Sequence, residues 1–495
     1  MPGSMSEVAQ SSNHAAPRHE SLAAAVRNAV LWRSGSHIVA QLVQWSATFT
    51  VIRILSPADY GLFAMTQVVI VLLSMLDGEG LTSALVRERT ITPRQIRQMF
   101  GLLLLLNGTL AAAQIALAPL AARYYGHPLV ADVLRVQALL YLTTPFIALP
   151  TALLQRVMDF RHQATTNILA SVASAAAALG GALAGWGVWT LVFAPMVMFA
   201  VRAVLMTRAA RSLVWPLFDF RGMGGLARYG GVMAGAQLVW FVQSQADVFI
   251  AGSRFGPFEL GLYTTALFLA QVFVSKIVPP LNEVAFSAYS RLQHDPAALA
   301  AAFLKGMRVV MTAAMPFYLG LAVTAEPLVL TVLGTKWAGA VPIVRVLACA
   351  MPFMTLQVLL APASDARGKP GIGLANGATG AAIMGAAFLV GVHWGPIGLA
   401  AAWVAAYPVY LAASLWRSLP VIGARLRDVA AGIVQPVLGS MAMAAAVVVA
   451  DTGMTWPSPF VRLVALVAVG ALAYAAWLAA FARPLVRELV AAARR

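Results

Sequence analysis

The chain has 495 residues, of which 60% are hydrophobic and only 11% are charged, and its mean hydropathy is +0.80. Soluble globular proteins carry about a quarter charged residues, so this composition excludes a soluble protein and predicts an all-α integral membrane protein. The net charge of +16 is spread over short loops, where it faces anionic lipid head groups, and we expect no nucleic-acid partner.

Residues 1–25 are polar and lack the apolar segment of a signal peptide, and we expect 1–28 to be a disordered cytoplasmic tail. Beyond them, fourteen windows are long and apolar enough to cross a bilayer. Their approximate limits are 34–55, 62–85, 99–121, 133–155, 163–184, 187–207, 229–251, 259–281, 308–330, 340–362, 372–392, 395–416, 430–450 and 460–481. We predict an N-terminal six-helix bundle over 29–210, a C-terminal six-helix bundle over 211–420, and two accessory helices with a cytoplasmic tail over 421–495.

The basic residues support this topology. With the N-terminus in the cytoplasm, 26 of the 34 Lys and Arg residues, Arg202 among them, fall on cytoplasmic segments. Seven fall on the outer side, and Lys276 remains within a span. This asymmetry follows the positive-inside rule, so we predict that both chain ends are cytoplasmic.

A short motif after the first span returns two hundred residues later. Ser56–Phe63 matches Gly256–Tyr263 with proline on proline, acid on acid and glycine on glycine, and Trp186-Gly187 returns as Trp394-Gly395. Two similar membrane halves are typical of transporters, which bind their substrate where the halves meet. Because six spans separate the copies, we predict parallel repeats with the motif as a hinge at the outer mouth and the binding site deeper in the membrane.

The sequence lacks the usual signs of an enzyme. It has no phosphate-binding G-x-x-x-x-G-K-[ST] loop, no long outer loop, and no recognisable nucleophile–base or paired-carboxylate arrangement in its loops. Its single cysteine, Cys349, excludes an intramolecular disulfide, and no Cys/His pair has ligand spacing. We therefore expect no enzymatic activity, no metal site and no cofactor, with energy drawn from an ion gradient or the substrate's own concentration difference.

Several segments together resemble bacterial polysaccharide flippases of the Wzx type, in the branch of the multidrug/oligosaccharidyl-lipid/polysaccharide exporter superfamily that exports colanic-acid-like units. The resemblance covers most of residues 30–420. The segments that carry it are Arg53–Gly61, Asp77–Arg87, Gly185–Leu191, Asp247–Gly252 with Gly261–Tyr263, and Val284–Gln293.

This resemblance implies two six-helix bundles around a central cavity that opens alternately to either side. The implied activity is translocation of undecaprenyl-diphosphate-linked exopolysaccharide, capsule or O-antigen units across the bacterial inner membrane. Membrane lipids and polysaccharide-assembly proteins such as a polymerase are the implied partners. Fourteen spans favour this branch over the twelve-span drug exporters. Two alternatives stay open: a cation-coupled exporter of small amphipathic compounds on the same fold, and a non-transporting scaffold of a polysaccharide synthesis complex.

A lipid diphosphate requires cations along its path, and three basic residues are candidates. Lys276 lies within a span. The alternative to a substrate role is that its side chain extends so that the ammonium group lies at the cytoplasmic interface. Arg53 and Arg254 flank the repeated motif and could meet the diphosphate, although each could instead pair with the acid of its motif, Asp59 or Glu259.

Polar residues within the first and seventh spans predict a cavity wall, with helix–helix hydrogen bonding as the alternative. They are Gln41, Gln44, Gln237, Gln243, Gln245 and Asp247. Of these we expect Gln243 to bind substrate, together with Trp240, which lies in mid-span among the glutamines. Asp247, Asp77 and Glu79 are candidates for binding a coupling ion, although the last two could instead lie at an interfacial helix end and pair with Arg87 or Arg89.

Overall fold

A computed structural model describes residue 41 and residues 44–76, 91–219 and 241–481. Over these residues the chain is all-α, as predicted, and contains eleven helical segments long and apolar enough to cross a membrane. One of these segments, Pro370–Ile422, holds two of the predicted spans, and the predicted spans 34–55 and 229–251 lie partly outside the described residues. A multi-pass membrane protein is therefore confirmed, while the total of fourteen spans stays a prediction.

The first half begins with a helix over residues 44–54. It continues with α2 (Pro57–Ser74), α4 (Pro93–Tyr125), α5 (Leu129–Gln137), α6 (Leu139–Thr143), α7 (Pro145–Arg156), α8 (Phe160–Leu183) and α9 (Val188–Ala209). The predicted single span 133–155 is divided into α5, α6 and α7. Pro145 explains the second break, because proline has no N–H to donate to the preceding turn.

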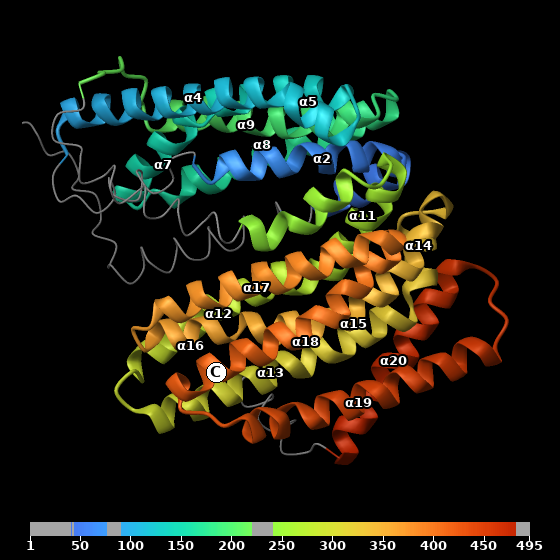
Figure 1. The fold of residues 1–495 in the computed structure, drawn as a ribbon. Coiled ribbons are helices and arrows are strands. Elements are labelled where there is room, and N and C mark those ends of the chain that lie inside the picture. Colours follow the sequence, from blue (N-terminus) through green and yellow to red (C-terminus); the bar gives the residue numbers. More distant parts are fainter. Residues whose placement is uncertain (1–40, 42–43, 77–90, 220–240, 482–495) are drawn as a thin grey trace, which may run out of the picture.

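The second half repeats this order. Its described part opens with helical residues 241–252 and continues with α11 (Pro257–Lys276), α12 (Val278–Arg291), α13 (Pro296–Val323), α14 (Ala325–Val332), the 3-10 helix η1 (Thr335–Ala340), α15 (Val341–Val358), α16 (Leu360–Ala366), α17 (Pro370–Gly391), the short η2 (Val392–Trp394) and α18 (Gly395–Ile422). In Figure 1 the first half lies above the second, and α2 and α11 are the helices through which the halves meet.

The fainter repeat of the sequence also has a structural counterpart. Gly187 stands at the turn between α8 and α9 with φ of 54°, and Gly395 stands at the turn between α17 and α18 with φ of 70°. Glycine populates this left-handed region at low cost, which explains why the same residue type occupies both turns. The two helix pairs are therefore equivalent elements of the two halves.

Two further helices follow the repeat. α19 (Leu426–Gly453) packs on α13, and α20 (Pro459–Phe481) packs on α19 and α14, so both belong to the outside of the second half (Figure 1). Arg462 of α20 fixes this arrangement, because its guanidinium donates to Asp451 at 2.7 and 2.8 Å and to Glu326 of α14 at 3.3 Å. The domain boundaries drawn from the sequence stay predictions.

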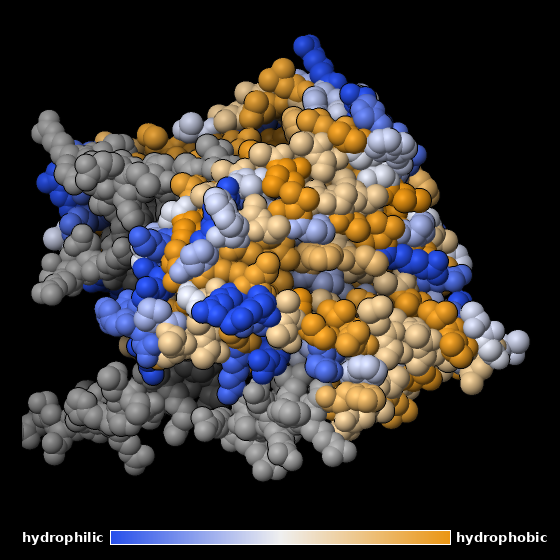
Figure 2. Space-filling model, turned by 60° about the horizontal axis from the view of Figure 1, so that its bottom comes forward, coloured by the Kyte–Doolittle hydropathy of each residue, from blue (hydrophilic) through white to orange (hydrophobic). Residues whose placement is uncertain are grey.

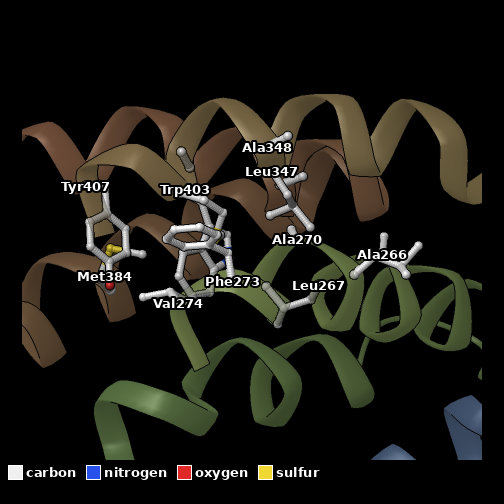
Figure 3. Close-up of a cluster of buried hydrophobic side chains, with 14 of the residues drawn as sticks. Ala266, Leu267, Ala270, Phe273, Val274, Leu347, Ala348, Met384, Trp403 and Tyr407 are labelled. Carbon is white, nitrogen blue, oxygen red and sulfur yellow. The ribbon is translucent and has the colours of Figure 1, made fainter. Parts of the chain in front are cut away.

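The core of the second half forms around α11. Small residues such as Ala266 and Ala270 let neighbouring helices approach, and Phe273 packs among side chains of α15, α17 and α18, including Trp403, which stacks on Tyr407 (Figure 3). On the outside, hydrophobic side chains cover much of the face shown in Figure 2. Large apolar residues such as Leu472 and Val449 are about 70% exposed, as expected of surface that faces lipid.

Candidate functional site

A central cavity of about 1280 Å³ separates the two halves. It is larger than typical small-molecule pockets, which hold roughly 300–1,000 Å³. The first half lines it with the helix that ends at residue 54 and with α2, the end of α7, α8 and α9, and the second half with Gln245, Val248, α11 and the start of α12. The cavity lies where the repeat predicts a substrate site, at the meeting of the halves.

The lining combines apolar side chains with many polar side chains, nearly all of which are uncharged. Seven of its side chains are glutamines: Gln41, Gln44, Gln67, Gln155, Gln163, Gln245 and Gln271. The predicted polar wall is thus confirmed for Gln41, Gln44 and Gln245, while Gln237 lies outside the described residues. Gln243 does not line the cavity; its Nε2 donates to the Tyr410 hydroxyl at 3.0 Å within the second half, so its substrate role stays a prediction.

Arg202 of α9 supplies the one cationic side chain among the described residues that line the cavity. Its Nε is buried and has no hydrogen-bond partner there. Counting Arg202 among the cytoplasmic loop residues was therefore wrong. The signal was available in the sequence, because Arg202 falls inside the predicted span 187–207, just as Lys276 falls inside its own.

Lys276 lies elsewhere. It is the last residue of α11, its side chain is exposed, and it is absent from the cavity lining. This position agrees with the alternative of an ammonium at the membrane interface. A substrate role for Lys276 stays a prediction. Among the described residues, the cationic side chain that lines the cavity is that of Arg202.

The repeated motif closes one end of the cavity. The starts of α2 and α11 cross so closely that a Cβ on Gly61 would lie 1.8 Å from the Pro257 carbonyl oxygen, and a Cβ on Gly261 1.7 Å from that of Pro57. Real Cβ atoms essentially never come within 3.0 Å of another heavy atom. The two glycines therefore permit a reciprocal backbone contact between the halves, which we call the α2–α11 junction.

Polar contacts reinforce the same end. The helix over residues 44–54 ends here, and its last carbonyls have no partner within the helix. Trp337 Nε1 donates to the Ile52 carbonyl and Lys336 Nζ to that of Ile54, both at 2.9 Å. The contacts described between the halves gather at this end, so the cavity is closed here. Its lining extends to Gln155 of α7 and Glu283 of α12, where the described helices of the two halves make no comparable contact, and we call this opposite end the wide end.

The ion pairs considered for the motif do not form. Asp59 instead caps α2, accepting from the Ser56 amide at 3.0 Å and hydroxyl at 2.6 Å. Arg53 donates to the Thr331 carbonyl of the other half at 2.7 Å. No ion pair joins Arg254 to Glu259, both of which are described and exposed. The alternative of acid pairing is thus wrong for both arginines, while their predicted meeting with a diphosphate stays open.

Asp247 is buried inside the second half and does not line the cavity. The Tyr263 hydroxyl donates to its carboxylate at 2.7 Å, and Trp403 Nε1 donates to that hydroxyl at 2.8 Å. These bonds link the helix over 241–252 to α11 and α18. The other two candidate ion ligands, Asp77 and Glu79, and the candidate substrate contact Trp240 lie outside the described residues. Within the described ranges, no group of three or more His, Cys, Asp or Glu gathers as a metal site would require.

Comparison with known proteins adds a family and a fold. Residues 50–342 match the family described as polysaccharide biosynthesis protein. The chain is 27% identical over 303 residues to the succinoglycan biosynthesis transport protein ExoT of Rhizobium meliloti (strain 1021), covering 61% of each chain. It is 23% identical over 319 residues to the lipopolysaccharide biosynthesis protein WzxC of Escherichia coli (strain K12), covering 61% of this chain and 65% of that one. The match thus spans less than two thirds of either relative.

Among solved structures, the lipid II flippase MurJ in an inward closed conformation superposes with a TM-score of 0.74 at 12% identity, over 92% of this chain and 100% of that one. A multidrug resistance transporter of the MATE family in an inward-facing conformation superposes with a TM-score of 0.60 at 14% identity, over 78% of this chain and 98% of that one. At these identities the likeness shows a shared fold of two helical bundles.

Proposed function

Since the chain belongs to the family of polysaccharide biosynthesis proteins, which its residues 50–342 match, we propose that it moves lipid-linked oligosaccharides from one membrane leaflet to the other. The substrate class is undecaprenyl-diphosphate-linked repeat units of an exopolysaccharide, capsule or O-antigen, and the membrane is the bacterial inner membrane. Relatives named for succinoglycan and lipopolysaccharide biosynthesis support this class, as does the likeness of fold to a lipid II flippase.

The chemistry of the cavity carries the proposal. A lipid-linked oligosaccharide presents a diphosphate, which needs a cation, and sugars, which need many hydrogen-bonding groups. Arg202 offers an unpartnered guanidinium edge, and the amides and hydroxyls around it offer donors and acceptors without net charge. The substrate enters from the wide end, and separation of the α2–α11 junction with closure at α7 and α12 then exposes it to the other side.

A reconstituted flipping assay tests the proposal. The purified chain is placed in liposomes with an undecaprenyl-diphosphate-linked trisaccharide ending in N-acetylglucosamine, and an impermeant galactosyltransferase outside reports what reaches the outer leaflet. Empty liposomes should expose about half of the lipid, by symmetry, and the protein should expose nearly all of it. If modification stops at the empty-liposome level under proton, sodium and potassium gradients alike, the protein does not flip this class of lipid.

We further propose that Asp247 couples transport to a cation or proton. A carboxylate buried in apolar surroundings is costly unless it is paired, and no cationic side chain accompanies Asp247 among the described residues. Asp247→Asn should keep the Tyr263 hydrogen bond, because an amide oxygen also accepts, yet remove the charge. A proton gradient can stimulate flipping at most about tenfold per pH unit, and we expect Asp247→Asn to abolish stimulation by an ion gradient. Flipping without a gradient should be unchanged.

Asp132→Asn is the matched control for Asp247→Asn, because Asp132 pairs with Arg135 on the exposed surface of α5. Both variants are compared in the flipping assay with and without a proton or sodium gradient. Full gradient stimulation in Asp247→Asn would show that coupling, if present, uses another residue.

A further inference from the structure

The side of α8 that faces the cavity carries a row of uncharged polar side chains. Gln163, Asn167, Ser171 and Ser174 follow one another at intervals of four, four and three residues, which places them on one side of the helix. At 1.5 Å per residue, the row is about 17 Å long. Within the part of the chain that the structure describes, none of these four side chains makes a hydrogen bond, and Gln163 Nε2 is buried without a partner.

We propose that this row on α8 is a saccharide-binding subsite and that it takes oligosaccharides of uncharged sugars bearing hydroxyl and acetamido groups. The inference rests on the proposed function and specifies its substrate. Buried polar atoms are normally paired, so Gln163 Nε2 requires a hydrogen-bonding ligand or water, and the other three polar side chains line the cavity without a protein partner among the described residues. An oligosaccharide satisfies them because hydroxyl groups both donate and accept.

The charges of the cavity explain why the sugars are uncharged. Among the described residues that line the cavity, Arg202 is the one basic residue of Arg or Lys type and Glu283 is the one acidic residue. The diphosphate already requires Arg202. A sugar carboxylate in the cavity would therefore lose its water without gaining a second cation as a partner. It would also share the cavity with the negatively charged Glu283, and both effects are unfavourable. Amides and hydroxyls, in contrast, bind neutral sugars without such a penalty.

The row and Arg202 lie at the same depth. A Cβ on Gly181 of α8 would be 3.1 Å from Thr190 Oγ1 of α9, so these residues are level with one another. Because the two helices pack antiparallel across a short turn, Arg202 is level with about residue 169, between Asn167 and Ser171. A diphosphate held by Arg202 thus brings the attached sugars directly onto the row.

Binding to the full chain in lipid nanodiscs tests the subsite with three probes. They are undecaprenyl diphosphate without sugar, the same lipid with a neutral trisaccharide, and the same lipid with one hexose replaced by a hexuronic acid. We expect the neutral probe to bind about tenfold more tightly than the uronate probe. Asn167→Leu, which keeps the side-chain size, should weaken the neutral probe about five- to tenfold and leave the sugar-free lipid unchanged.

Thr165→Val on the exposed side of α8 is the matched control and should bind all three probes as the wild type does. Equal or tighter binding of the uronate probe would overturn the charge preference. An Asn167→Leu variant that binds all probes normally, or loses all three equally, would overturn the subsite. The expected binding pattern without any flipping would instead contradict the proposed function alone, because binding does not require translocation.

Discussion

Gly61→Ala is expected to shift the protein toward the conformation in which the α2–α11 junction is open and the cavity is accessible from the other side of the membrane. The new methyl group would lie 1.8 Å from the Pro257 carbonyl oxygen, and a backbone atom in a packed helix cannot move aside as a flexible side chain can. Overpacking of this kind costs about 1–3 kcal/mol, which lowers the ratio of closed to open α2–α11 junction roughly 5- to 150-fold. Gly261→Ala should act alike through Pro57, because the contact is reciprocal.

Sided labelling measures this shift. The single native cysteine is removed as Cys349→Ser, and Gln67→Cys places a thiol on the cavity lining six residues along α2 from Gly61. An impermeant maleimide added to vesicles of known orientation should label this thiol from the wide end in the parent. It should label the thiol from the junction end in Gly61→Ala, and lipid flipping should fall in step.

Gly256→Ala provides the control from the same motif. A Cβ there meets nothing within 4 Å, so it should leave the labelling pattern and flipping unchanged. A thermal unfolding scan separates a trapped protein from an unfolded one. If folded Gly61→Ala is still labelled from the wide end only, the α2–α11 junction is not the gate.

Arg202→Gln is expected to cause the largest loss of substrate binding. Charge-assisted hydrogen bonds to a phosphate contribute about 1.5–3 kcal/mol, so affinity for undecaprenyl diphosphate should fall roughly 10- to 150-fold. Arg202→Lys should recover only part of this, because an ammonium keeps the charge but not the planar fork of donors. The fold should survive, because removing a partly buried charge whose Nε has no partner relieves part of a desolvation cost.

Arg208→Gln is the matched control for Arg202→Gln, since Arg208 lies on the same helix but is exposed. Affinity is measured in nanodiscs with undecaprenyl diphosphate, and unfolding temperature is followed in parallel. Unchanged affinity in a folded Arg202→Gln protein would remove Arg202 from the diphosphate site. An equal loss in Arg208→Gln would show that general surface charge, and not the cavity, determines binding.

The sequence was informative where local chemistry decides the structure. Ser56 and Asp59 specify the start of α2 through a capping box, and Pro57 and Pro257 begin equivalent helices because proline is suited to the first turn. The repeat correctly indicated two like halves. Apolar length predicted the helices, since a bilayer leaves no other arrangement for a single span.

Site residues were harder to predict from the sequence, because polar side chains on a membrane helix face either a cavity or a neighbouring helix. Gln243 and Gln245 stand two positions apart, so they point to different sides: Gln243 bonds Tyr410, and Gln245 lines the cavity. Arg202 and Lys276 both fall within predicted spans, yet only Arg202 faces the cavity.

By itself, the sequence determined that this is an all-helical membrane protein with two related halves, because hydropathy, caps and prolines act over a few residues. Only the tertiary structure decided that Gly61 and Gly261 meet across the halves, that Arg53 reaches Thr331, and that Arg202 is the cationic side chain among the described residues that line the cavity. These outcomes depend on which helix faces lie opposite one another. That pairing joins residues hundreds of positions apart and is fixed by packing of the whole bundle.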